Sequence, residues 1–164
     1  MKKYLFTLIA LSFLMGASCQ QKTDNEKEMK AHSDANLEVW NTGNVSLFDE
    51  ILSPEIVMHS NESEDLIGIE ANKGWVTSTR TGFPDFNVTF DKIIIKGEYI
   101  AVGWTATGTN TGHFIGFPPT GKKVKFSGAF ITHVVNGKEI ETWQHFDMAS
   151  LLTQLGYTIS PPEE

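Results

Sequence analysis

The sequence predicts a mixed α+β fold in which a strongly curved antiparallel sheet wraps around N-terminal helices to form a cone. Segments with helical periodicity come first along the chain, four successive strand segments with turn signals between them follow, and a short helical segment ends the run. The strand interiors also contain the small residues that curvature and close ligand approach require, namely Gly103, Gly108, Gly112 and Gly128. Because a cone that is open at one end forms a pocket, we expect a ligand-binding cavity.

The first half of the domain is expected to contain three helices and one short strand. Apolar positions repeat at helical spacing over residues 28–41, and a shorter helix is expected over residues 45–52. Residues 55–60 follow as a strand that carries His59 near its end, and a third helix is expected over residues 69–80.

The second half is expected to be a meander of strands. The four strands and the helix that closes them are expected over residues 86–96, 99–110, 122–135, 139–147 and 148–155. Asn136-Gly137 supplies the two positive-φ positions of a two-residue hairpin. The third and fourth of these strands should therefore pair as antiparallel neighbours.

The last predicted strand brings chemically different side chains to one face. Alternation places an indole, an imidazole and a carboxylate together, those of Trp143, His145 and Asp147. The opposite face carries Ile140, Thr142, Gln144 and Phe146. If the first face lines the cavity, Trp143 would exclude water from the Asp147 carboxylate, and desolvation disfavours the charged form of a carboxylate. We therefore expect Asp147 and His145 to be the catalytic acid–base residues of the cavity.

Other interpretations of these two residues stay open. Asp147 directly precedes the last predicted helix, and aspartate is a favoured N-cap residue, so it could serve the fold instead of a reaction. His145 could be a partly buried histidine of the sheet. Five further cavity residues are expected to bind substrate: His59, Trp40, Trp104, Phe130 and Trp143, although aromatic residues at strand centres are also ordinary core residues.

Neither a metal nor an organic cofactor is expected. The five histidines and the single cysteine, Cys19, show no spacing that is typical of metal ligands, and no glycine-rich phosphate loop or serine nucleophile elbow is present. The formal net charge of −7 repels nucleic acid and anionic lipid head groups, so we expect no nucleic-acid partner.

The N-terminus has the pattern of a bacterial export signal. Two lysines precede a short apolar run, and small residues lead to Cys19, as in a lipoprotein signal. We therefore expect a signal peptide over residues 1–18, lipidation of Cys19, a polar tether over residues 19–27, a folded domain over residues 28–158 and a tail over residues 159–164. The protein would then lie in the bacterial cell envelope, and only its N-terminal lipid anchor would bind a membrane.

A set of short motifs resembles a known family in order and spacing. The motifs are Trp40-Asn41-Thr42-Gly43-Asn44, Gly68-Ile69-Glu70, Phe83-Pro84-Asp85, Gly108-Thr109-Asn110-Thr111-Gly112, Pro119-Thr120-Gly121-Lys122, Asn136-Gly137-Lys138-Glu139-Ile140, Trp143 with Asp147, and Gln154-Leu155-Gly156. From about Met29 to Gly156 the chain looks like the SnoaL-like polyketide cyclases, also called ester cyclases, which share the nuclear transport factor 2 fold.

The resemblance implies a cone-shaped α+β barrel that forms dimers or tetramers and a reaction without metal or organic cofactor. Of the two assemblies we expect the homodimer. In the characterised cyclases, an aspartate that matches Asp147 is the general acid/base of an intramolecular aldol ring closure. The chain departs from many relatives at Asn110, where they have histidine. A histidine-assisted step on that strand is therefore not expected here.

Two functions follow from these expectations. The first is a cofactor-independent cyclase or isomerase that acts on a small apolar carbonyl compound. The second is a non-catalytic envelope lipoprotein, whose cone binds a hydrophobic small molecule or a protein partner.

Overall fold

The computed structural model describes residues 26–60 and 64–158. The expected signal peptide, Cys19 and the expected tail lie outside these residues, so export and lipid anchoring stay predictions. No helix in the described part of the chain is long and apolar enough to cross a membrane.

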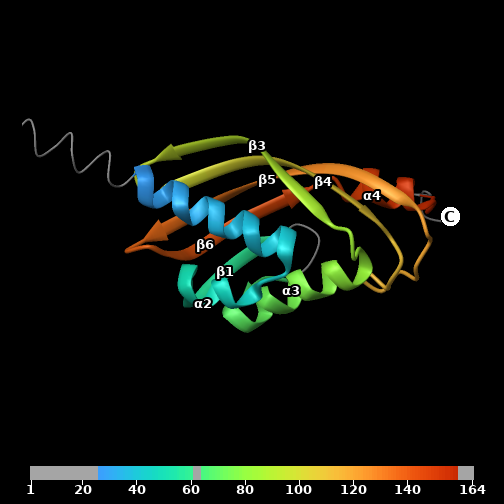
Figure 1. The fold of residues 1–164 in the computed structure, drawn as a ribbon, viewed down its shortest axis with the longest axis horizontal. Helices are drawn as coiled ribbons and strands as arrows, with labels where there is room; N and C mark the ends of the chain where they lie inside the picture. Colours follow the sequence, from blue (N-terminus) through green and yellow to red (C-terminus); the bar gives the residue numbers. More distant parts are fainter. Residues whose placement is uncertain (1–25, 61–63, 159–164) are drawn as a thin grey trace, which may run out of the picture.

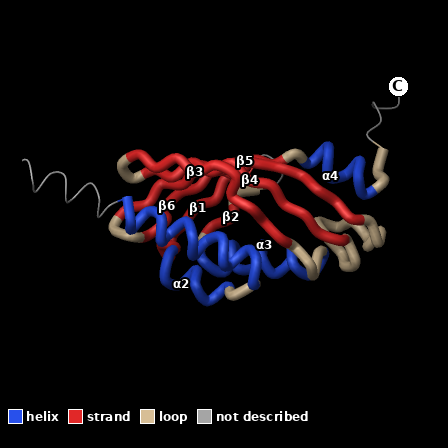
Figure 2. The backbone as a smooth tube through the Cα atoms, turned by 45° about the horizontal axis from the view of Figure 1, so that its top comes forward, coloured by secondary structure: helices blue, strands red, loops and turns tan. Residues whose placement is uncertain are grey.

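The strands form one six-stranded sheet in the order β2-β1-β6-β5-β4-β3. Their bounds are β1 Leu52–Ser60, β2 Leu66–Ile67, β3 Asn87–Lys96, β4 Tyr99–Thr109, β5 Lys123–Val135 and β6 Lys138–Phe146. The sheet is strongly curved and stays open, with β2 and β3 at its edges (Figures 1 and 2). The α+β fold expected from the sequence is confirmed, as a half-wrapped sheet rather than a closed barrel.

Helices cover the concave face of the sheet. They are a first helix over residues 26–42, the 3-10 turn η1 Val45–Leu47, α2 Phe48–Ile51, α3 Ile69–Gly82 and α4 Met148–Leu155. The first helix (blue) and α3 (green) lie across the same face of the sheet, while α4 lies near its far end (Figure 1). The helix expected over residues 45–52 is split into η1 and α2, and its last residue already belongs to β1.

One pairing in the sheet, between β1 and β6, was not expected from the sequence. The meander β3-β4-β5-β6 has the expected antiparallel neighbours, and Asn136 and Gly137 both have positive φ in the turn before β6. On the other side of β6, however, lies β1, which runs parallel to it. A parallel neighbour needs a long crossover connection, and here β2, α3, β3, β4 and β5 separate the two strands in the chain.

Two clusters of buried residues join the helices to the sheet. The larger one lies between the meander and the first helix and includes Phe83, Val102 and Leu151. The smaller one lies under α2 and the start of β1 and includes Val39 and Ile56. Between these clusters the packing leaves the hollows that form the candidate site.

Candidate ligand-binding site

An aromatic chamber lies between the helices and the concave face of the sheet. Its walls come from the first helix, α3, β3, β4, β5 and β6, and include Trp40, Trp75, Trp104, Phe126, Phe130 and Phe146. The volume of the chamber that the centre of a water molecule can occupy is ≈ 40 Å³. One water needs about 10–15 Å³ by this measure, so the protein does not fill the chamber with its own side chains. The space corresponds to about three water molecules.

A more polar hollow adjoins the aromatic chamber. It measures ≈ 30 Å³ by the same definition and shares four wall residues with the chamber: Trp40, Trp75, Phe130 and Gln144. Its other walls include polar groups, among them Asn36, Asn72, Glu139 and Thr142. A ligand in the chamber would therefore meet polar partners at this side.

Gln144 is the polar residue that borders both spaces. No hydrogen bond within the described part of the chain engages its side-chain amide. An amide carries both hydrogen-bond donors and an acceptor. Among aromatic walls, where water does not compete, a hydrogen bond to such a group is stronger than it is in water. Gln144 is therefore placed to bind a carbonyl or hydroxyl group of a ligand.

The structure places Trp143, His145 and Asp147 outside the chamber. The alternation expected for β6 is present, but the face that lines the chamber is that of Gln144 and Phe146. The expectation that the Asp147 carboxylate lies in the aromatic hollow is wrong. Asp147 is exposed, and its Oδ1 accepts a hydrogen bond from the backbone N–H of Ser150 at 2.8 Å, as an N-cap of α4 does. His145 is exposed as well.

His59 also lies on the convex face and not in the cavity. Its ring stacks on Trp143 with a centroid distance of 5.8 Å and an interplanar angle of 27°. Its Nε2 lies 3.0 Å from Glu141 Oε1 and its Nδ1 lies 2.9 Å from Asp65 Oδ2. The hydrogen bond to Glu141 raises the pKa of His59 above its ordinary value of 6.5, with Asp65 adding to the increase and partial desolvation opposing it. The expectation that His59 and Trp143 line the cavity is wrong, because their strand positions face the other side of the sheet.

The other three expected binding residues do line the chamber. Trp40 comes from the first helix, Trp104 from β4 and Phe130 from β5. Phe130 also meets Phe90 of β3 edge-on, with ring centroids 5.6 Å apart. Their position in the wall is confirmed, while their role in binding stays a prediction.

The sequence interpretation missed Glu139, which lies on the cavity side. The register between β5 and β6 shifts there: Val134 pairs with Glu139, but His133 pairs with Glu141, so Ile140 is an extra residue. Strict alternation had placed Glu139 on the face of Trp143. The extra residue turns Glu139 inward together with Thr142. Nothing in the residue types of this segment signals the shift.

The chamber wall is held by contacts that cross between elements. Asn41, at the end of the first helix, donates to the carbonyl of Val88 at 3.0 Å and accepts from the N–H of Val88 at 2.7 Å. Arg80 of α3 donates to the carbonyls of Trp40 and Phe86 at 2.9 and 3.2 Å. These bonds fix the ends of both helices to the start of β3, beside the chamber.

Asn110 has a structural task at the end of β4. It is buried, donates to the carbonyl of Gly112 at 2.9 Å and accepts from the N–H of Thr120 at 2.8 Å. These bonds close the loop that carries Phe114 to the chamber. The residue that departs from the pattern of many relatives thus shapes a loop and does not enter the cavity.

Comparison with known proteins identifies the family of this chain. The family model described as SnoaL-like polyketide cyclase matches residues 30–155, which is most of the chain. The chain belongs to the SnoaL-like polyketide cyclase family. No curated protein matches it closely.

This SnoaL-like protein is similar in fold to several proteins of solved structure. AclR from Streptomyces galilaeus, a candidate hydroxylase, has a TM-score of 0.71 at 28% identity, covering 84% of this chain and 86% of AclR. IdmH from Streptomyces antibioticus, a candidate polyketide cyclase, has a TM-score of 0.64 at 28% identity, covering 77% of this chain and 99% of IdmH. A Catenulispora acidiphila protein with a ketosteroid isomerase-like fold, solved with trimethylamine, is 15% identical with a TM-score of 0.67, covering 79% of this chain and 97% of that protein. The last likeness concerns the fold alone.

The described residues of this SnoaL-like protein contain no group of three or more His, Cys, Asp or Glu side chains arranged to hold a metal ion.

Proposed function

We propose that this SnoaL-like protein binds a small, largely apolar carbonyl compound in the aromatic chamber and acts on it as a cofactor-independent cyclase or isomerase. The observation that carries the proposal is the unengaged amide of Gln144 between aromatic walls. Aromatic walls favour an apolar ligand body, and an amide N–H is a donor for a carbonyl oxygen. Membership of the polyketide cyclase family supports the reaction class.

A matched pair of ligands tests the binding step. The ketone 2-tetralone and the hydrocarbon tetralin have the same two-ring frame and differ at the carbonyl. Three tryptophans line the chamber, so binding of either compound to the full chain can be followed by tryptophan fluorescence. We expect both compounds to bind, and the ketone to bind more tightly.

The variant Gln144→Leu identifies the polar contact. Losing one neutral hydrogen bond costs about 0.5–1.5 kcal/mol, so the affinity for 2-tetralone should fall by roughly twofold to tenfold. The affinity for tetralin should stay the same. Absence of binding by both compounds, or an equal loss for both in Gln144→Leu, would contradict the proposal.

A second candidate function is binding without turnover. No carboxylate in the described part of the chain lines the aromatic chamber itself, and this observation favours a carrier of a hydrophobic compound. Under this alternative 2-tetralone binds as proposed, but the protein leaves it chemically unchanged under all conditions.

We also propose that the convex face of the sheet binds a second copy of the chain. A row of registered residues, Ile94, Ala101, Ile131 and Trp143, crosses β3, β4, β5 and β6 on this face. Ile94 and Ile131 are 58% and 46% exposed, which is unusual for large aliphatic residues in a row.

The charges beside this row fit a two-fold arrangement. Lys92 and Lys96 lie on the convex face of β3, whereas Glu141 and the nearby Asp65 lie at the opposite end of the row. A two-fold axis parallel to the strands would lay β3 of one copy over β6 and β1 of the other. The lysines of each copy would then face the carboxylates of its partner.

A further inference from the structure

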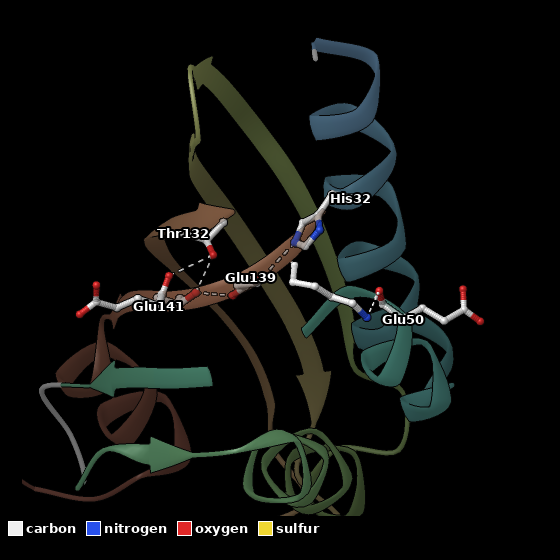
Figure 3. A network of polar contacts seen from close by, with 7 residues as sticks. His32, Glu50, Thr132, Glu139 and Glu141 are labelled. Carbon is white, nitrogen blue, oxygen red and sulfur yellow. Dashed lines mark hydrogen bonds and ion pairs between the residues drawn. The ribbon is translucent and has the colours of Figure 1, made fainter. Parts of the chain in front are cut away.

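A buried histidine contacts a buried glutamate that lines the polar hollow. His32 of the first helix and Glu139 of β6 have side chains that are only 4% and 6% exposed, and His32 Nε2 lies 3.1 Å from Glu139 Oε2. Figure 3 shows the imidazole pointing from the helix toward the strand. A buried charge is costly unless it is paired, so this arrangement needs an explanation.

The other carboxylate oxygen of Glu139 is also held. The Thr142 hydroxyl donates to Glu139 Oε1, and the Thr132 hydroxyl lies 2.8 Å from that of Thr142. Both threonines are buried. The carboxylate therefore has one fixed position, and Glu139 is a wall residue of the hollow that Gln144 borders.

The same corner contains unused hydrogen-bonding capacity. His32 Nδ1 and Asn36 Oδ1 are buried and have no hydrogen-bond partner among residues 26–60 and 64–158, and the two residues are one helical turn apart on the first helix. Asn36 lines the hollow as well. Buried polar groups are normally satisfied, so a purely structural network would be expected to close these contacts. An unpaired buried polar atom beside a cavity is a position where a ligand or an ordered water can form the hydrogen bond.

We propose that Glu139 is the acid–base residue of this cavity and that His32 is a positioning residue that orients its carboxylate. This inference rests on the proposed function. It identifies the substrate class as a ketone with an acidic C–H next to the carbonyl, whose apolar body fills the aromatic chamber. The carbonyl oxygen accepts a hydrogen bond from Gln144, and the C–H points toward Glu139.

The reaction needs no other reagent. The Glu139 carboxylate takes the proton from the carbon next to the carbonyl, the C–H electron pair forms the carbon–carbon double bond of an enolate, and the carbonyl π pair moves onto oxygen. The Gln144 N–H stabilises that oxygen. In an isomerisation the Glu139 carboxylic acid returns the proton to another carbon of the conjugated system. In a ring closure the enolate carbon attacks a second carbonyl of the same molecule, and the proton goes to the new alkoxide oxygen.

Hydrogen–deuterium exchange measures the first step directly. The full chain is incubated with 2-tetralone in D₂O, and proton NMR follows loss of the signals of the hydrogens next to the carbonyl. We expect the wild-type protein to accelerate exchange above buffer. Glu139→Gln should lower the protein-dependent rate constant by about 100-fold or more, since general acid–base catalysis contributes factors of this size. Its affinity for 2-tetralone should change by less than about threefold, because the carboxylate does not contact the carbonyl oxygen.

Glu141→Gln is the matched control. Glu141 is two residues away on the same strand but contacts His59 on the convex face, so its variant should exchange at the wild-type rate. An exchange rate in Glu139→Gln equal to that of the wild type would overturn the proposal. If circular dichroism shows Glu139→Gln to be unfolded, Thr142→Val replaces it. That variant removes the hydrogen bond to Oε1 and should lower the rate at unchanged affinity, and a wild-type rate would overturn the proposal equally.

The positioning role of His32 has its own comparison. His32→Leu should lower the exchange rate by about tenfold, with the affinity for 2-tetralone retained. His32→Gln keeps an N–H near the position of Nε2 and should recover part of the rate. A merely structural role would reduce melting temperature and affinity together and would give no recovery of rate by glutamine, and this result would overturn the assignment.

Failure of this inference can be told apart from failure of the proposed function. If 2-tetralone does not bind the wild-type protein, the proposed function fails. If it binds with the expected dependence on Gln144, but exchange is no faster than in buffer, only the acid–base role of Glu139 fails.

Discussion

The Asp147 carboxylate accepts a hydrogen bond from the backbone N–H of Ser150 at 2.8 Å and so caps α4 at the end of β6. Replacing an N-cap aspartate by alanine typically costs about 1 kcal/mol of folding stability, whereas asparagine is nearly as good a cap. We therefore expect Asp147→Ala to lower the free energy of unfolding by about 1 kcal/mol and Asp147→Asn to leave it nearly unchanged, as measured by urea denaturation.

The same two variants test the role of Asp147 in chemistry. Because the carboxylate lies outside the chamber, both should bind 2-tetralone and exchange its hydrogens as the wild type does. If Asp147→Asn keeps its stability but loses hydrogen–deuterium exchange of 2-tetralone, Asp147 is the catalytic residue, as the sequence resemblance implies.

Most of the fold was predictable because its signals are local. Asn136-Gly137 predicts the turn between β5 and β6, and both residues have the positive φ that such a turn needs. The bounds of α4 follow from a capping aspartate at one end and Gly156 with a φ of 96° at the other. The parallel pairing of β1 with β6 was not predictable, because no local pattern records which strands meet across a long connection.

The candidate site was predictable only in part, for a related reason. Strand alternation correctly separates Trp143 from Gln144 but does not say which face points inward. A tryptophan beside a carboxylate suggests a cavity, yet here the inward face carries Gln144 and Phe146. Glu139 was hidden by the register shift at Ile140, which depends on the pairing with β5.

Gly128 lies where the backbone of β5 closely approaches the Trp104 indole in the chamber wall. A Cβ at this position would overlap the indole of Trp104 and the backbone carbonyl of His145. We expect Gly128→Ala to lower the free energy of unfolding by about 1–3 kcal/mol and to weaken 2-tetralone binding, because Trp104 must move within the wall. Gly103→Ala is the control, since the nearest atom to its new methyl group is Lys92 Cβ at 3.9 Å. Equal effects of both substitutions would contradict this reason.

His59 should stabilise the fold more at low pH than at high pH. Its contacts with Glu141 and Asp65 raise its folded pKa above the ordinary value of 6.5. The stabilisation by protonated His59 is therefore fully present below about pH 6.5 and is lost as the pH rises through the raised folded value. The melting temperature of His59→Gln should lie further below that of the wild type at about pH 5.5 than at about pH 8.5. His113→Gln, at an exposed position, should show no such difference, and an equal gap for His59→Gln at both pH values would contradict the prediction.

Ile131 lies at the centre of the apolar row on the convex face of the sheet, between Ala101 and Trp143. In a face-to-face dimer, a lysine here would bury an unpaired charge at the two-fold axis, which an interface does not tolerate. We expect sedimentation velocity to show a dimer for the wild-type protein and a monomer for Ile131→Lys. Ile67→Lys, on the edge strand β2, replaces an even more exposed isoleucine, 69% against 46%, and should stay dimeric because it lies outside the row. A monomeric wild type, or dissociation by both substitutions alike, would remove the convex face as the interface.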